Sequence, residues 1–122
     1  MKNARSFEEL YKKMENFNVQ NYHYIICQNI KRIRKELFEE YQAYYKLKGT
    51  KNPYTTQSVA ELLDISYEYY KRIESFDKTK PISLKVLLKA QYLFDRDIEE
   101  FFRDHNGISV YDKDNDMEAV KN

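Results

Sequence analysis

The fold is decided by the stretch Tyr54-Thr-Thr-Gln-Ser-Val-Ala-Glu-Leu-Leu-Asp-Ile-Ser-Tyr-Glu-Tyr-Tyr-Lys-Arg-Ile-Glu74. The spacing of its apolar residues predicts two short amphipathic helices separated by a tight polar turn. The first helix should begin after Thr55, whose hydroxyl can accept a hydrogen bond from an exposed backbone N–H group. Ala60 is the small residue that lets the second helix approach closely. We expect three apolar side chains on the buried face, Val59, Leu62 and Leu63.

The second helix of this stretch should present a polar face to solvent. Asp64 and Ile65 make the turn, Ser66 caps the helix, and Tyr70 and Ile73 face inward at i, i+3 spacing. The residues left facing outward are Tyr67, Glu68, Lys71 and Arg72. A polar face at the start of a capped second helix fits the major groove of DNA. The stretch therefore predicts a helix-turn-helix and, as the leading hypothesis, sequence-specific DNA binding.

Two flanking segments extend this pattern. They are Ile26-Cys-Gln-Asn-Ile-Lys-Arg-Ile-Arg34 upstream and Pro81-Ile-Ser-Leu-Lys-Val-Leu-Leu-Lys-Ala-Gln-Tyr-Leu-Phe-Asp-Arg-Asp-Ile-Glu-Glu-Phe-Phe102 downstream. With them, about two thirds of the chain resembles the Cro/repressor-type helix-turn-helix family, also called lambda-repressor-like or xenobiotic-response-element-type. The resemblance implies an all-α, five-helix DNA-binding domain. It also implies that an arginine late in the first helix pairs with a glutamate that ends the third, and Arg34 and Glu74 occupy these positions.

The sequence departs from the family pattern between the first two helices of that domain. Twenty residues lie between Arg34 and Thr55, which predicts an inserted segment over residues 38–53. The glutamine that the family often places after the cap of its second helix is replaced by Thr56, and Gln57 follows immediately. The loop that ends the insertion carries Lys48 and Lys51, which could reach a DNA backbone.

Two helical segments carry more apolar surface than a five-helix core can cover. Residues 1–20 form an N-terminal amphipathic helix with a capping box at Ser6, and its stripe is Phe7, Leu10, Tyr11, Met14 and Phe17. This stripe either packs against its own domain or makes a dimer contact. A second helix should run from Asn21 to about Leu47 and end at Gly49. Its second half, together with the N-terminal helix, should build a self-association or partner surface from Tyr41, Tyr44, Tyr45 and Leu47.

The DNA-binding domain spans residues 21–104, and its C-terminal third should contain two more helices. Ser83 caps the first, whose expected core residues are Leu84, Leu87, Leu88 and Leu93. Asp97 opens a last short helix that carries Ile98, Phe101 and Phe102. Residues 108–111 could form a short strand, and residues 105–122 form an acidic tail.

Composition limits the classes of function. The 122 residues carry a net charge of +1, but residues 28–89 hold 13 Lys and Arg against 8 Asp and Glu, while residues 95–118 hold 3 against 9. The basic part coincides with the proposed DNA-binding unit. Cys27 is the single cysteine, and no apolar run is long enough for a signal peptide or a membrane span, so we expect a cytoplasmic protein. Cys27 itself should be a small packed side chain.

No constellation points to catalysis, a metal or a cofactor. Asp112, Asp114, Asp116 and Glu118 lack the glycine and the twelfth ligand of a calcium loop. His23 and His105 have no acidic or cysteine neighbours at metal-ligand spacing, so they are expected to be solvated surface residues. We find no nucleophile motif and no glycine-rich phosphate loop, which argues against an enzyme.

The sequence therefore predicts a DNA-binding transcriptional regulator, most simply a repressor that binds an inverted-repeat operator in double-stranded DNA as a homodimer. The residues expected to contact DNA are Thr56, Gln57, Tyr67, Glu68, Lys71 and Arg72, with the loop lysines Lys48, Lys51, Lys78 and Lys80. The rival hypothesis keeps the fold but uses it on another protein, as an antitoxin or a phage-type inhibitor of a nucleic-acid-processing enzyme does. The aromatic residues of the long helix, the acidic tail and Glu68 favour this rival.

Overall fold

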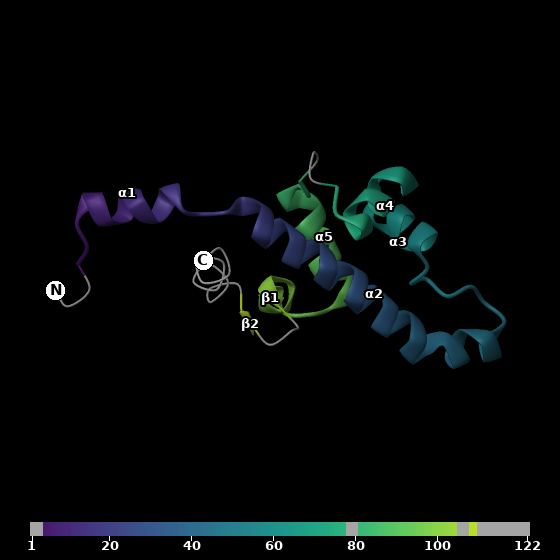
Figure 1. Ribbon diagram of the computed structural model, residues 1–122. Helices are drawn as coiled ribbons and strands as arrows, with labels where there is room; N and C mark the ends of the chain where they lie inside the picture. The colour runs from purple at the N-terminus through teal and green to yellow at the C-terminus, as the bar shows by residue number, and fades with distance from the viewer. Residues whose placement is uncertain (1–3, 78–80, 105–107, 110–122) are drawn as a thin grey trace.

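A computed structural model describes residues 4–77, 81–104 and 108–109 (Figure 1). The described residues are mainly helical, in the order α1 (Phe7–Glu15), α2 (Val19–Lys48), α3 (Thr56–Leu63), α4 (Tyr67–Ser75) and α5 (Leu84–Phe94). A 3-10 helix, η1 (Ile98–Phe102), follows and leads into β1 (Arg103–Asp104). This strand pairs in an antiparallel manner with β2 (Ile108–Ser109). The all-α class expected from the sequence is thus confirmed, apart from these two-residue strands.

The helices begin and end where short-range chemistry predicts. Ser6, Thr55, Ser66 and Ser83 each accept a hydrogen bond at the side chain from the backbone N–H three residues later. Gly49 ends α2 in the left-handed conformation, with φ +71°, which a glycine adopts without the steric cost of a Cβ. The inserted segment at residues 38–53 is mainly a continuation of α2, which is 30 residues long.

The core lies between the first half of α2 and the helices that follow it. Ile26, Ile30, Ile33 and Leu37 form the α2 side. They pack with a set of side chains from the later elements, which are Val59, Leu63, Tyr70, Ile73, Val86, Leu87, Phe94 and Phe101. Figure 1 shows α3, α4 and α5 gathered along α2, whereas α1 extends away from this body and the last turns of α2 project beyond it.

Several expectations about burial are wrong. Leu62, Leu84 and Leu88 were assigned to the core, but they are 55%, 69% and 49% exposed. In α3 the small side chains of Ser58 and Ala60 take the buried positions next to Val59 and Leu63. In α5 the core face is formed by Val86, Leu87, Ala90 and Phe94, while Leu93 is half-buried against it. Each helix has more large apolar residues than its contact face can hold, and its neighbours select which of them are covered.

The two unusual segments do not form one surface. The sequence suggested that α1 and the end of α2 act together, yet they lie at opposite ends of a helix about 45 Å long at a rise of 1.5 Å per residue (Figure 1). No residue of α1 is buried, so the alternative in which α1 packs against its own domain is also wrong. The fifth helix of the expected domain is a 3-10 helix rather than an α-helix.

Candidate nucleic-acid interface

The pair α3 and α4 forms the candidate interface. Asp64 ends α3 with φ +58°, its own N–H bonds to the carbonyls of Ala60 and Glu61, and the N–H of Ile65 reaches Ala60 at 3.0 Å. These bonds satisfy carbonyls at the end of α3 and reverse the chain within three residues. Ser66 then starts α4 with a 3.0 Å hydrogen bond from the Tyr69 N–H to its Oγ. The two helices are therefore joined by the short polar turn that the sequence predicts.

One face of α4 is buried and the other is open to solvent. Tyr70 and Ile73 are 0% and 3% exposed and face the core, as expected. The four residues named from the sequence, Tyr67, Glu68, Lys71 and Arg72, are all exposed, and so is Ser75 at the end of the helix. Lys71 Nζ lies over the ring of Tyr67 at 5.0 Å from its centroid, which pre-orients both side chains on the same strip of surface. Arg72 Nε is 3.9 Å from Asp77 Oδ2, a contact that the sequence analysis did not anticipate.

The orientation of α4 on α2 is set by the ion pair expected from Arg34 and Glu74. Arg34 Nε donates to Glu74 Oε2 at 2.5 Å and Nη2 donates to Oε1 at 3.0 Å, while Nη1 donates to the Tyr54 carbonyl at 3.0 Å. Both charged side chains are 10% exposed. Burial opposes the charged form of Arg34, but the hydrogen bonds and charge of Glu74 outweigh it and raise the pKa of the guanidinium. The pair thus connects α2, α4 and the residue that precedes the cap of α3.

The aromatic ring of Tyr70 lies beside this ion pair. Burial raises the pKa of the Tyr70 hydroxyl, and the neighbouring Glu74 carboxylate raises it further. Tyr70 is therefore neutral at any physiological pH, and it contributes packing rather than charge.

The helix α4 ends at a residue with an uncommon backbone conformation. Phe76 has φ +57°, a region that bulky residues rarely adopt. Its ring packs against His23 at 5.1 Å and against Tyr24 at 5.0 Å between centroids. This burial offsets the backbone cost and joins the end of α4 to the start of α2.

His23 is buried rather than solvated, which corrects the expectation from the sequence. It is 6% exposed, and its Nε2 accepts a hydrogen bond from the Ile82 N–H at 3.1 Å. Burial lowers the pKa of the imidazole, and the charge of Asp77 opposes this change. The sequence did offer a signal for this burial, because His23 lies three positions before Ile26 and therefore on the buried face of α2. His105 lies outside the described residues.

The other residues proposed for DNA contact are spread over α3, the loop before it and the end of α2. Thr56 is half-buried and Gln57 is exposed in the first turn of α3, beside a shallow groove of about 330 Å³ that Lys35 also lines. Lys51 Nζ is 4.0 Å from Glu61 Oε2, and both side chains are largely exposed. Lys48 lies over the ring of Tyr44 at 5.7 Å, at the far end of α2. Lys78 and Lys80 lie outside the described residues.

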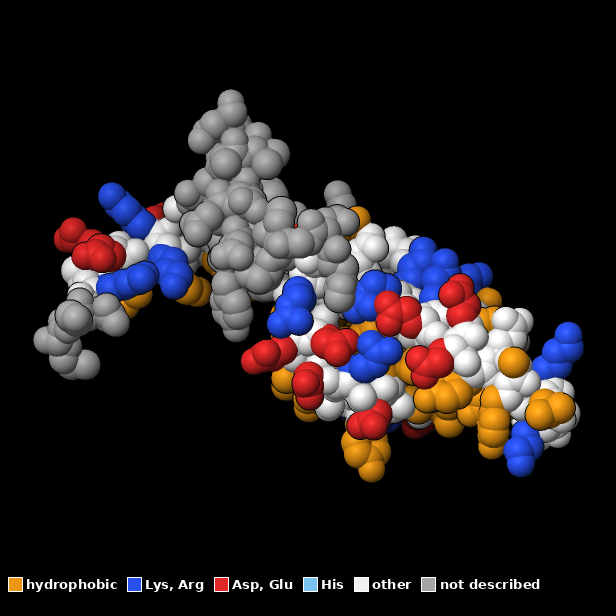
Figure 2. Space-filling model, turned by 90° about the horizontal axis from the view of Figure 1, so that it is seen from below, with side chains coloured by type: hydrophobic (Ala, Val, Ile, Leu, Met, Phe, Trp, Pro, Cys, Tyr) orange, Lys and Arg blue, Asp and Glu red, His pale blue; other side chains and the backbone are white. Residues whose placement is uncertain are grey.

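Some rings of the proposed partner surface at the end of α2 contact one another or the neighbouring loop. Tyr41 stacks on Tyr54 at 6.2 Å, and Tyr44 meets Tyr45 edge to face at 5.1 Å between centroids. Tyr45 is half-buried, whereas Tyr41, Tyr44 and Leu47 are 39%, 53% and 89% exposed. Figure 2 shows hydrophobic side chains next to lysines and arginines at this end of the body. Three of the four residues named for this surface are thus exposed, and Tyr45 is partly covered; a partner at this surface stays a prediction.

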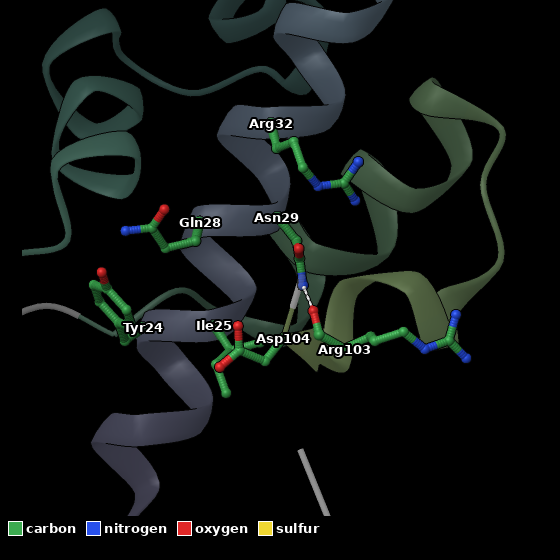
Figure 3. Close-up of a pocket in the computed structure, with 7 residues that line it drawn as sticks. All are labelled: Tyr24, Ile25, Gln28, Asn29, Arg32, Arg103 and Asp104. Carbon is green, nitrogen blue, oxygen red and sulfur yellow. Dashed lines mark hydrogen bonds between the residues drawn. The ribbon is translucent and has the colours of Figure 1, made fainter. Parts of the chain in front are cut away.

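A polar pocket on the other side of α2 was missed by the sequence analysis. It has a volume of about 260 Å³ and is lined by Tyr24, Ile25, Gln28, Asn29, Arg32, Arg103 and Asp104. The Asn29 Nδ2 group donates hydrogen bonds to two backbone carbonyls, that of Phe101 at 2.9 Å and that of Arg103 at 2.7 Å. In Figure 3 the side chains of Tyr24 and Gln28 point to one side of α2 and that of Arg103 to the other. Because its polar groups diverge, the pocket is not arranged to hold one ligand.

The described residues contain no group of three or more His, Cys, Asp or Glu side chains placed to hold a metal ion. Among the same residues, no helix is long and apolar enough to cross a membrane. Cys27 is 1% exposed, and burial raises the pKa of its thiol to about 12, as for a packed structural side chain. The acidic residues from Asp112 to Glu118 lie outside the described part.

Comparisons of the chain with models of protein families, with curated proteins and with solved structures find no match.

Proposed function

We propose that α3, its turn and α4 form a helix-turn-helix of the Cro/repressor type, and that the protein is a sequence-specific DNA-binding transcriptional regulator. In this proposal it binds an inverted-repeat operator as a homodimer and represses transcription by occupying a promoter. The observation that carries the proposal is the exposed polar face of α4, held in a defined orientation on α2 by the buried Arg34–Glu74 pair. A rigidly presented helix face with few apolar side chains suits a major groove better than a protein core.

The residues take different roles in this mechanism. Lys71 and Arg72 donate to acceptors on guanine, and Glu68 accepts from the amino group of cytosine. Tyr67 supplies an apolar face for a thymine methyl group. The first turn of α3, with Thr56 and Gln57, and the lysines Lys48 and Lys51 contact phosphates and set the register on the duplex.

The proposal is tested by selecting bound sequences from a random pool of duplex DNA at low salt. We expect one sequence class to be enriched, with an affinity that falls steeply as salt increases because each neutralised phosphate releases counterions. Lys71→Ala with Arg72→Ala should abolish recognition and leave the helical circular-dichroism signal intact. A matched control, Lys85→Ala with Arg103→Ala, removes the same charge from exposed positions on α5 and β1 and should keep the sequence preference. A pool that shows no enrichment contradicts the proposal.

A second candidate function is supported by the exposed aromatic surface at the end of α2. Tyr41, Tyr44 and Leu47 are exposed outside the core, and exposed clusters of this kind often mark protein contacts. The exposed Glu68 also suits a protein partner better than a phosphate. In this alternative the fold is a protein-interaction module, such as an antitoxin or a phage-type inhibitor of a nucleic-acid-processing enzyme. It becomes the leading proposal if the DNA selection fails.

A further inference from the structure

The N-terminal helix α1 has an apolar face that is not buried. Its four large apolar side chains and that of Phe17, just beyond its end, remain open to solvent, with Phe7 80%, Leu10 45%, Tyr11 58%, Met14 67% and Phe17 41% exposed. Figure 2 shows hydrophobic side chains gathered along one edge of α1, apart from the body of the molecule. A nine-residue helix is marginal in water by itself, even with the good caps at Ser6 and Asn16. The helix is therefore expected to be stabilised by a partner that covers this face.

Four of the five charged residues of α1 lie in two blocks, and the fifth, Glu15, is its last residue. Glu8 and Glu9 lie in its first turn, and Lys12 and Lys13 lie in its last turn. At helical spacing Glu8 and Lys13 border the apolar face, while Glu9 and Lys12 lie on the other side of the helix. A helix that is acidic at its start and basic at its end is electrostatically complementary to a second copy of itself that runs in the opposite direction.

We infer that α1 pairs with α1 of a second copy of this chain, antiparallel and centred between Leu10 and Tyr11. In this register Phe7 faces Met14 of the second copy and Leu10 faces Tyr11 of the second copy. The same register brings Glu8 of each copy next to Lys13 of the other. A parallel pair would instead set glutamate beside glutamate and lysine beside lysine, which is unfavourable. The antiparallel pair also opposes the two helix dipoles.

The size of the contact predicts a weak dimer. With about 200 Å² for a large side chain that is fully exposed, the five apolar residues offer on the order of 600 Å² per copy. A stable interface buries about 800 Å² per partner, so this pair lies near the lower limit. We expect a dimer that dissociates in the micromolar range.

The pairing leaves the rest of each molecule accessible. Because α2 continues from the C-terminal end of α1, the two bodies leave an antiparallel pair at opposite ends (Figure 1). The exposed face of α4 is then uncovered in both copies. The inference goes beyond the proposed function, since α1 pairing requires no DNA and is measured without it.

Charge reversal tests the pairing directly. Sedimentation of the full chain should show a concentration-dependent dimer. Glu8→Lys with Glu9→Lys makes positions 8, 9, 12 and 13 all basic, and Lys12→Glu with Lys13→Glu makes the same four positions all acidic. Each variant alone should be a monomer, and an equimolar mixture should recover a dimer. Recovery in the mixture distinguishes pairing from a loss of helix in α1, because a helix that has simply unfolded does not gain affinity for an oppositely charged one.

Disulfide trapping tests the direction of the pair. Phe7→Cys and Met14→Cys should cross-link in a mixture of the two variants and not in either variant alone, whereas a parallel pair cross-links each variant with itself. The native Cys27 does not interfere because it is buried. As a control, Tyr41→Glu with Tyr45→Glu at the far end of α2 should sediment as the wild type does. The inference is overturned by a monomeric wild-type chain at high micromolar concentration, by a mixture that stays monomeric, or by a dimer that only the tyrosine variant disrupts.

Discussion

The two halves of α2 belong to one continuous helix and have opposite surroundings. In the first half, apolar residues from Ile25 to Leu37 are less than 8% exposed, and this helix contacts α4, α5 and η1. In the second half, Tyr41, Tyr44 and Leu47 continue the apolar pattern but remain exposed. Helical periodicity is similar in both halves, so it does not distinguish a core from an open surface. What differs is whether another element packs on the helix.

The largest difference between the halves should appear in core truncations. Ile33 is 0% exposed, so Ile33→Ala should cost roughly 2–5 kcal/mol of unfolding free energy through lost burial and an unfilled cavity. Leu47 is 89% exposed, so Leu47→Ala should change the same quantity by less than about 0.5 kcal/mol. Urea denaturation of both variants measures the contrast. Equal losses would show that the end of α2 is covered in solution.

The buried ion pair of the first half should rank next. Removing one partner leaves the other charge buried and unpaired, so Arg34→Ala should lose on the order of 3 kcal/mol. Arg32 pairs with Glu36 on the more exposed side of the same helix, and Arg32→Ala should lose about 1 kcal/mol or less. Thermal melts compare them under one condition. An Arg34→Ala protein that melts within a degree or two of the wild type contradicts the structural role of the pair.

A smaller effect is expected where the second half of α2 is connected to the body. Asn52 Nδ2 donates to the Phe38 carbonyl at 3.0 Å, and its Oδ1 accepts from the Tyr54 N–H at 2.9 Å. Asn52→Ala should therefore cost about 1 kcal/mol. It should also speed amide exchange at Tyr54, while Gln42→Ala on the exposed side of α2 leaves that amide unchanged. Unchanged exchange in both variants would show that the loop is held by other contacts.

The weakest effect should be a pH dependence from His23 in the first half. Its pKa is lowered in the folded state, chiefly by burial, so the folded protein binds fewer protons than the unfolded chain. The stability that the protein gains from keeping His23 neutral is fully present above about pH 6.5, the ordinary histidine pKa. It is lost as the pH falls through the lower pKa of the folded state. His23→Gln should have a shallower decline of stability over this window, measured by urea titrations at several pH values. Parallel declines for the two proteins would exclude the contribution.

The local structure of α3 and α4 was predicted well from the sequence. Thr55 and Ser66 cap α3 and α4 because a hydroxyl at that position satisfies an N–H that has no helical partner. The exposed set from Tyr67 to Arg72 follows from the spacing of Tyr70 and Ile73 in a helix. The contact between Arg72 and Asp77 was missed because it forms across the left-handed turn at Phe76, a conformation that the residue type does not suggest.

The sequence by itself determined the caps of α1, α3, α4 and α5 and the exposed residues of α4, because these depend on interactions over three or four residues. The long helix α2 begins at Val19, after its cap Asn18, rather than near Asn21 as expected. Only the tertiary structure decided that Leu62, Leu84 and Leu88 are exposed. It also decided that His23 is buried as a hydrogen-bond acceptor and Asn29 as a hydrogen-bond donor. The partners of His23 and Asn29 lie 59 and 72 residues away in the chain. Such contacts depend on how the helices pack, and several residues of suitable chemistry compete for each buried position until the packing selects one.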